Sequence, residues 1–82
     1  MDINDFVKSF ANQFDDTGSS EITAETAYHD LDEWSSMIGL SVLNMVDKNY
    51  GVTLTFDELK HGVTIQNLFD TIVSKQKKLS PL

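Results

Sequence analysis

Few side chains in this sequence could take part in chemistry, and Ser36 is the one whose position needs an explanation. The chain has no cysteine, which excludes a disulfide framework, a thiolate metal site and a cysteine nucleophile. His29 and His61 are too few for a histidine metal cage and are not spaced as a pair. No nucleophile elbow surrounds Ser36, so nothing brings it together with a histidine and an aspartate as a triad. The sequence therefore predicts no catalytic residue and no metal site. Taken without its surroundings, Ser36 is best interpreted as an ordinary serine at the start of a helix.

The acidic residues are the second group with chemical potential. Asp30, Asp32 and Glu33 could hold a divalent cation weakly, but they lack the spacing and the glycine of a calcium loop, so we expect a solvated acidic loop. The whole chain has a formal net charge of -7, with 13 acidic and 6 basic side chains, and every acid except Asp70 lies in residues 1–58. Such a surface repels phosphate backbones and anionic lipids. We therefore expect no nucleic acid and no membrane among the partners, and favour basic protein surfaces.

The length of the chain limits how these residues can be organised. Its 82 residues are sufficient for a single domain, 1–82, with a modest core. No secretory signal and no apolar stretch long enough to cross a bilayer is visible. A cytoplasmic protein is the expectation.

The apolar residues recur at the helical spacing of three and four over most of the chain. We expect helices at about 2–15, 36–50, 56–61 and 65–77. A long loop at 16–34 carries enough apolar residues to be ordered and to cover the core. The predicted fold class is therefore all-α, a four-helix bundle with three long helices, a short third helix and a long first loop.

The ends of these helices have recognisable signals. Thr55 and Glu58 fit a capping box, Thr64 can cap the last helix, and Gly51 is the expected stop of the second. Gly39 lies inside the second helix, where it costs roughly 0.5–1 kcal/mol relative to alanine. Either another group approaches closely at Gly39, or the glycine is simply tolerated.

The stretch from Leu31 to Met37, at the start of the second helix, resembles the signature of the acyl carrier protein family. That signature is Asp-Ser-Leu. Ser36 matches its modified serine, Met37 matches the leucine, and Ser35 stands where the family has aspartate. Three further stretches match in order, and together they extend the resemblance over nearly the whole chain: Tyr50-Gly51-Val52, Phe56-Asp57-Glu58-Leu59 and Val63-Thr64-Ile65-Gln66-Asn67-Leu68.

The resemblance implies a carrier that is not itself an enzyme. A phosphopantetheinyl transferase would move 4′-phosphopantetheine from coenzyme A to the Ser36 hydroxyl, and the thiol of this arm would hold acyl groups as thioesters. The start of a helix suits this attachment, because its unpaired N–H groups and positive dipole end favour a phosphate. The implied partners are that transferase, an acyl-loading synthetase or ligase and acyl-processing enzymes, and the carrier would be a monomer. The residues expected to face partners are Asp32, Glu33, Ser35, Met37, Leu40, Asn44 and Asp47.

Two departures from the family pattern shape the expected function. Ser35 caps a helix about as well as aspartate but removes a charge beside Ser36, and Asp32 and Glu33 are close enough in sequence to supply one. The second helix also has fewer acids than fatty-acid carriers, with Lys48 at one such place. We interpret this as service to a dedicated pathway rather than to general fatty acid biosynthesis, with a fatty acyl, polyketide, aminoacyl or other cargo.

A second class of function stays open beside the carrier. A protein with the same fold and no arm could use the Met37 and Leu40 surface as an interaction module, and the serine at position 35 keeps this alternative alive. Trp34 could contact a partner or the arm, but we expect it to fold over the helix start and fill a gap.

Overall fold

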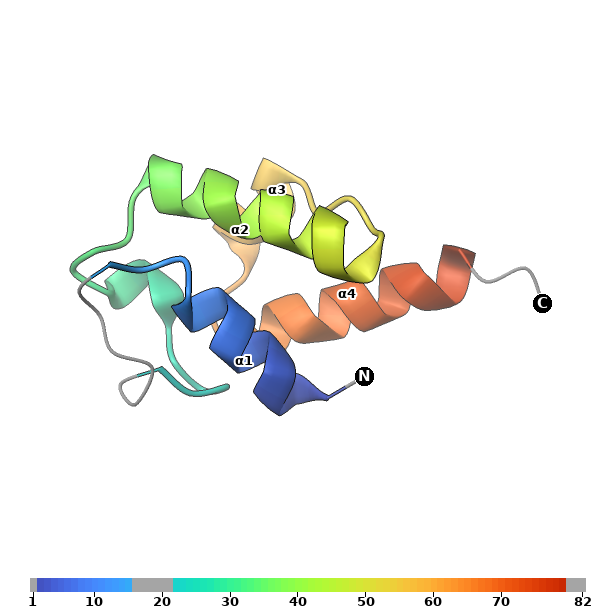
Figure 1. The fold of residues 1–82 in the computed structure, drawn as a ribbon, viewed down its shortest axis with the longest axis horizontal. Helices are drawn as coiled ribbons and strands as arrows, with labels where there is room; N and C mark the ends of the chain where they lie inside the picture. The colour runs from blue at the N-terminus through green and yellow to red at the C-terminus, as the bar shows by residue number, and fades with distance from the viewer. Residues whose placement is uncertain (1, 16–21, 80–82) are drawn as a thin grey trace.

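The computed structural model describes residues 2–15 and 22–79, and the described chain is all-α (Figure 1). The sequence predicted this class and the short third helix. Most of the long loop expected at 16–34 is described, and residues 16–21 lie outside the described part. No helix in this part of the chain is both long and apolar enough to traverse a membrane. The elements are α1 (Ile3–Ala11), the 3-10 turn η2 (Tyr28–Asp30), α2 (Ser36–Tyr50), α3 (Phe56–His61) and α4 (Ile65–Leu79).

Helix α1 begins where the sequence predicted but ends earlier. The Asp2 side chain accepts a hydrogen bond from the Asn4 N–H at 3.0 Å and caps the helix. The helix ends at Ala11 rather than at residue 15. Beyond it, the Phe14 amide bonds to the Ala11 carbonyl at 3.1 Å, three residues back, which is the tighter spacing of a 3-10 turn. The turn keeps Phe14 buried although the α-helix has stopped.

The core is built around a series of aromatic rings contributed by α1 and the loop that follows it. Phe10 is fully buried and its ring is stacked parallel to that of Trp34, with centroids 6.2 Å apart. Tyr28 is also fully buried, 5.7 Å from the Phe10 centroid and 5.0 Å from that of Trp34. Aliphatic side chains from the other helices complete the core: Val42, Val46, Leu59, Ile65, Leu68 and Ile72.

The described part of the loop is held by the first turn of α4. The N–H of Ile65 donates to the Thr26 carbonyl at 3.2 Å, and the N–H of Gln66 donates to the Ala24 carbonyl at 2.8 Å. The first N–H groups of a helix have no partner within the helix, so these bonds satisfy donors that would otherwise need solvent. The expected ordered loop that covers the core is present at residues 22–34.

The predicted capping signals form as expected around α3. Thr55 and Glu58 make both halves of a capping box, with the Glu58 N–H 3.1 Å from the Thr55 Oγ1. The Glu58 carboxylate also lies 2.8 Å from the Lys75 Nζ, which ties α3 to α4. Partial burial by itself would raise the pKa of Glu58, but the hydrogen bonds from Lys75 and Thr55 outweigh it and lower that pKa below its usual value.

Alkaline pH should destabilise the fold through Tyr28. Burial raises the pKa of Tyr28 from 10.0 to about 12, because the tyrosinate would lose its hydration. The folded-state pKa exceeds the unfolded one, so this stabilisation is complete below pH 10 and is lost as the pH rises through about 12. A shift of this size corresponds to about 2–3 kcal/mol. Urea unfolding between pH 9 and pH 12 should show a steeper loss for the wild type than for Tyr28→Phe. Equal losses in the two proteins would contradict the assignment.

Candidate functional site

Two serines at the start of α2 differ in their structural role. Ser35 is the N-cap, and its Oγ accepts a hydrogen bond from the Ile38 N–H at 3.3 Å. Ser36 is the first residue of the helix and its side chain is exposed. Because Ser35 does the capping, the hydroxyl of Ser36 is not needed to hold the helix end. The exposed hydroxyl on a rigid element that the sequence predicted is therefore present at Ser36.

The outer face of α2 carries most of the residues expected to meet partners. Met37 is 81% exposed and Leu40 is 50% exposed, although both are apolar. Asn44 and Asp47 continue the same exposed face one and two turns further along the helix. The four side chains thus form one stripe, and their contact with a partner stays a prediction.

Asp32 and Glu33, the two acids ahead of α2, differ in their exposure to solvent. Asp32 is exposed. Glu33 is half-buried, and its carboxylate accepts a hydrogen bond from the Asp15 N–H at 2.7 Å, which connects it to the end of the α1 segment. Glu33 therefore holds the loop against the α1 segment. The sequence had suggested Glu33 as one of two acids that could replace the aspartate charge missing at position 35. Of the pair, only Asp32 has an exposed side chain. Within residues 2–15 and 22–79, no cluster of three or more histidine, aspartate or glutamate side chains could hold a metal ion.

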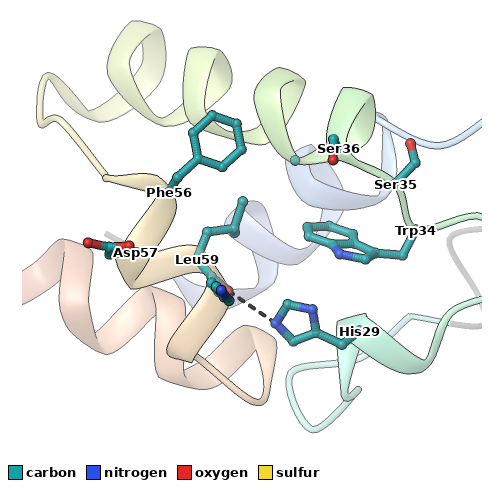
Figure 2. Close-up of a pocket in the computed structure, with 9 residues that line it drawn as sticks. His29, Trp34, Ser35, Ser36, Phe56, Asp57 and Leu59 are labelled. Atoms are coloured by element: carbon teal, nitrogen blue, oxygen red, sulfur yellow. Dashed lines mark hydrogen bonds between the residues drawn. The ribbon is translucent and has the colours of Figure 1, made fainter.

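A groove opens directly beside Ser36, between the start of α2 and helix α3 (Figure 2). Its volume is about 390 Å³. Trp34, Leu59 and Phe56 supply an apolar surface, and Figure 2 shows the Leu59 side chain between the other two rings. Phe56 is 52% exposed, so one of its ring faces is open to the groove and to solvent. The remaining lining residues are His29, Ser35, Ser36, Gly39, Asp57 and Lys60.

Gly39 explains how the groove floor can lie so close to α2. A β-carbon at this position would lie 3.0 Å from the Leu59 Cδ2 and 3.6 Å from the Trp34 Cζ2. The first distance is closer than ordinary carbon contacts, so the absence of a side chain lets Leu59 reach the helix. Of the two explanations that the sequence left open for Gly39, the structure supports the close approach of another group.

The two walls of the groove are tied together at the carbonyl of Leu59. The Tyr28 hydroxyl donates to this oxygen, and the His29 Nε2 lies 3.2 Å from the same atom (Figure 2). One wall belongs to the loop that leads to Ser36 and the other belongs to α3. The double contact therefore joins the loop to α3 beside the groove. Trp34 packs against Phe10 and Tyr28 while it also lines the groove, so it fills a gap as expected and faces the site as well.

The stability of this helix start should depend on Ser35. Ser35→Ala removes the cap and should lower the free energy of unfolding by about 0.5–2 kcal/mol, whereas Ser35→Asp should leave it within a few tenths, because both side chains accept the same bond. Urea denaturation of the three proteins measures the difference. Should Ser35→Ala be as stable as the wild type, the observed hydrogen bond does not act as a cap.

The sequence analysis missed half of the groove. It did not single out Phe56, Lys60 or Leu59 as site residues, since a spacing of 20 or more positions from Ser36 carries no information about proximity. The one available signal was an apolar residue at position 56, directly after the cap Thr55, where α3 leaves it exposed.

Comparisons of the chain with protein-family models, with curated proteins and with solved structures gave no match. The function is therefore inferred from the residue pattern and from the geometry of the site.

Proposed function

We propose that this protein is an acyl carrier protein that bears a 4′-phosphopantetheine arm on Ser36. The Ser36 oxygen would form the new phosphoester bond, the pyrophosphate bond of coenzyme A would break, and adenosine 3′,5′-bisphosphate would leave. A separate phosphopantetheinyl transferase would supply the catalysis. The thiol of the arm would then carry an acyl group between a loading synthetase or ligase and the enzymes that process it, in a dedicated biosynthetic pathway.

The observation that carries the proposal is that Ser35 caps α2, which leaves the Ser36 hydroxyl exposed and not needed for capping. A hydroxyl that receives a large group cannot also be engaged in holding the helix, and here the cap is provided by Ser35 alone. The exposed Ser36 lies at the positive end of a helix of 15 residues, where a phosphodiester is stabilised by the dipole and the first N–H groups. The four-helix order and the motif matches along the chain agree with the same family.

The surroundings of Ser36 also suit a carrier. The exposed stripe that starts at Met37 and Leu40 lies directly after the attachment serine, so an enzyme that docks there would have the arm at hand. The groove on the other side of Ser36 offers an apolar resting place for a flexible arm. A group carrier needs both a docking surface and a place that limits the freedom of its cargo.

Intact-mass measurement tests the proposal. The purified protein is incubated with coenzyme A, magnesium and a broad-specificity phosphopantetheinyl transferase. We expect a gain of one phosphopantetheinyl group, with fragment masses that locate it at Ser36. No gain with several transferases, on a protein whose helical circular dichroism is intact, would overturn the proposal.

The unmodified interaction module is the second candidate, and one observation favours it. Met37 and Leu40 expose apolar surface whether or not an arm is present, and Ser35 leaves the neighbouring position without the charge found in the family. This candidate predicts that a partner binds the apo protein and that Met37→Ser weakens the binding while Ser36→Ala does not.

A further inference from the structure

The interior of the bundle beneath Ser36 is closed by two side chains. Leu59 Cδ2 and the Trp34 ring lie against α2 at Gly39, at 3.0 and 3.6 Å from the place of a β-carbon. Two wall atoms with a saturated chain between them would have to be about 8 Å apart, because the chain carbons stay about 4 Å from each wall. A chain that starts at Ser36 therefore cannot pass between α2 and α3 to the buried residues below Gly39 unless one of these side chains moves.

Both side chains are packed against buried neighbours. Trp34 is stacked on the fully buried Phe10 and packs against Tyr28. Leu59 is 2% exposed, and its backbone carbonyl is held by the Tyr28 hydroxyl and contacted by His29. Below them, Val42 and Val46 are fully buried in a core of close-packed side chains. Opening a passage would separate contacts on both walls at once.

The groove outside this barrier has the shape and surface for a flat group. Two of its walls are aromatic, Trp34 and the half-exposed Phe56, with Leu59 between them as floor. Aromatic rings favour offset or edge-to-face contacts with one another, which stabilise them beyond the effect of the area they bury. Lys60 and Asp57 border the same groove and leave its rim polar, so the end of a short cargo there stays hydrated or hydrogen-bonded.

We propose that Trp34 and Leu59 determine the cargo of this carrier by closing the core. The carried group is a short aromatic acyl group that rests on Phe56 in the surface groove. Long saturated chains are not enclosed. This inference rests on the proposed function for the arm, but not on the enzyme that attaches it. Leu59 is the residue that sets the length limit, and Phe56 is the residue that favours a ring.

The absence of cysteine in the chain allows a test that needs no transferase. Ser36→Cys introduces a single thiol, which is alkylated with haloacetamide arms of pantetheine length that end in benzamide, decanamide or, as control, acetamide. Two-dimensional NMR then follows the indole N–H of Trp34, the only tryptophan, the methyl groups of Leu59, and the methyl groups of Val42 and Val46.

The expected result is a ring-current shift of the Leu59 methyl and Trp34 indole signals with the benzamide arm only. Phe56→Ala in the same protein should remove most of this shift, and it should fold normally because Phe56 is half-exposed. The decanamide arm should leave Val42 and Val46 unshifted, whereas adding Leu59→Ala should let it reach them.

Two outcomes would overturn the inference: groove signals that do not respond to the benzamide arm, or Val42 and Val46 signals that shift with the decanamide arm while Leu59 is present. Either outcome leaves the modification of Ser36 by a transferase as a separate question, because the arm is attached chemically. Conversely, a failure of the enzymatic mass gain would not alter the groove result. If Leu59→Ala does not fold, the Phe56→Ala comparison still decides between the outcomes.

Discussion

Ser36→Ala is expected to abolish every gain of phosphopantetheinyl mass while leaving the helical circular dichroism and the unfolding midpoint unchanged. The loss should be complete, because the new phosphoester bond needs the Ser36 oxygen and no neighbouring group can replace it. Ser35 has a hydroxyl one residue away, but that oxygen accepts the Ile38 N–H and belongs to the residue before the helix. The backbone of Ser35 is extended, whereas Ser36 is the first residue of the helix, so the two hydroxyl groups leave the chain in different directions.

Two matched variants make this result specific. Ser74→Ala removes an equally exposed serine from α4 and should be modified at the wild-type rate. Ser35→Ala weakens the helix start and should slow the modification without preventing it. A mass gain that persists in Ser36→Ala and disappears in Ser35→Ala would reassign the attachment residue. The change at Ser36 itself should affect stability by no more than about half a kcal/mol, as for most exposed positions.

Phe10→Ala is expected to destabilise the fold by about 3–5 kcal/mol, the range for removing a buried aromatic ring. Phe10 is fully buried and contacts four other aromatic residues, which are Phe6, Phe14, Tyr28 and Trp34. A domain of this size has about 5–15 kcal/mol of stability in total, so the loss is a large fraction of it and the variant should unfold at a much lower denaturant concentration. Chemical denaturation followed by circular dichroism gives the magnitude.

The control for this prediction is the same substitution at an exposed phenylalanine. Phe56→Ala removes an identical side chain that is 52% exposed, so it should cost far less than Phe10→Ala. The Phe10 variant should also alter the fluorescence of Trp34, because the ring against which Trp34 stacks is gone. Similar stability losses for the two variants would mean that Phe10 is not the centre of the core.

The helical class and the ends of the helices followed from local signals in the sequence. The capping box at Thr55 and Glu58 is a pattern within four residues, and a stop such as Gly51 needs only its own positive φ of 68°. These features depend on neighbours in the chain, so a sequence contains them in full. The extent of α1 was wrong for a related reason: Phe14 keeps the apolar spacing while the backbone has already changed to a 3-10 turn.

The groove could not be predicted in the same way. It depends on Phe56 and Leu59 lying opposite Trp34 and Ser36, and their juxtaposition is set by how α3 packs under α2. Gly39 gave a partial signal, since a glycine inside a helix indicates that something approaches closely, but the sequence does not say what. The double contact on the Leu59 carbonyl has no pattern in the sequence, because a backbone oxygen is present at every residue.

The bonds between the loop and the first turn of α4 join parts of the chain that are synthesised at different times. Thr26 and Ala24 receive their hydrogen bonds from Ile65 and Gln66, which are made about 40 residues later. On the ribosome, Ala24 and Thr26 can gain these two bonds only once the first turn of α4 has been made, whereas Trp34 can contact Phe10 of α1 as soon as both have emerged. The loop therefore reaches its full set of contacts only after α4 has been synthesised, and an enzyme that reads the loop as well as the serine would favour chains that include α4.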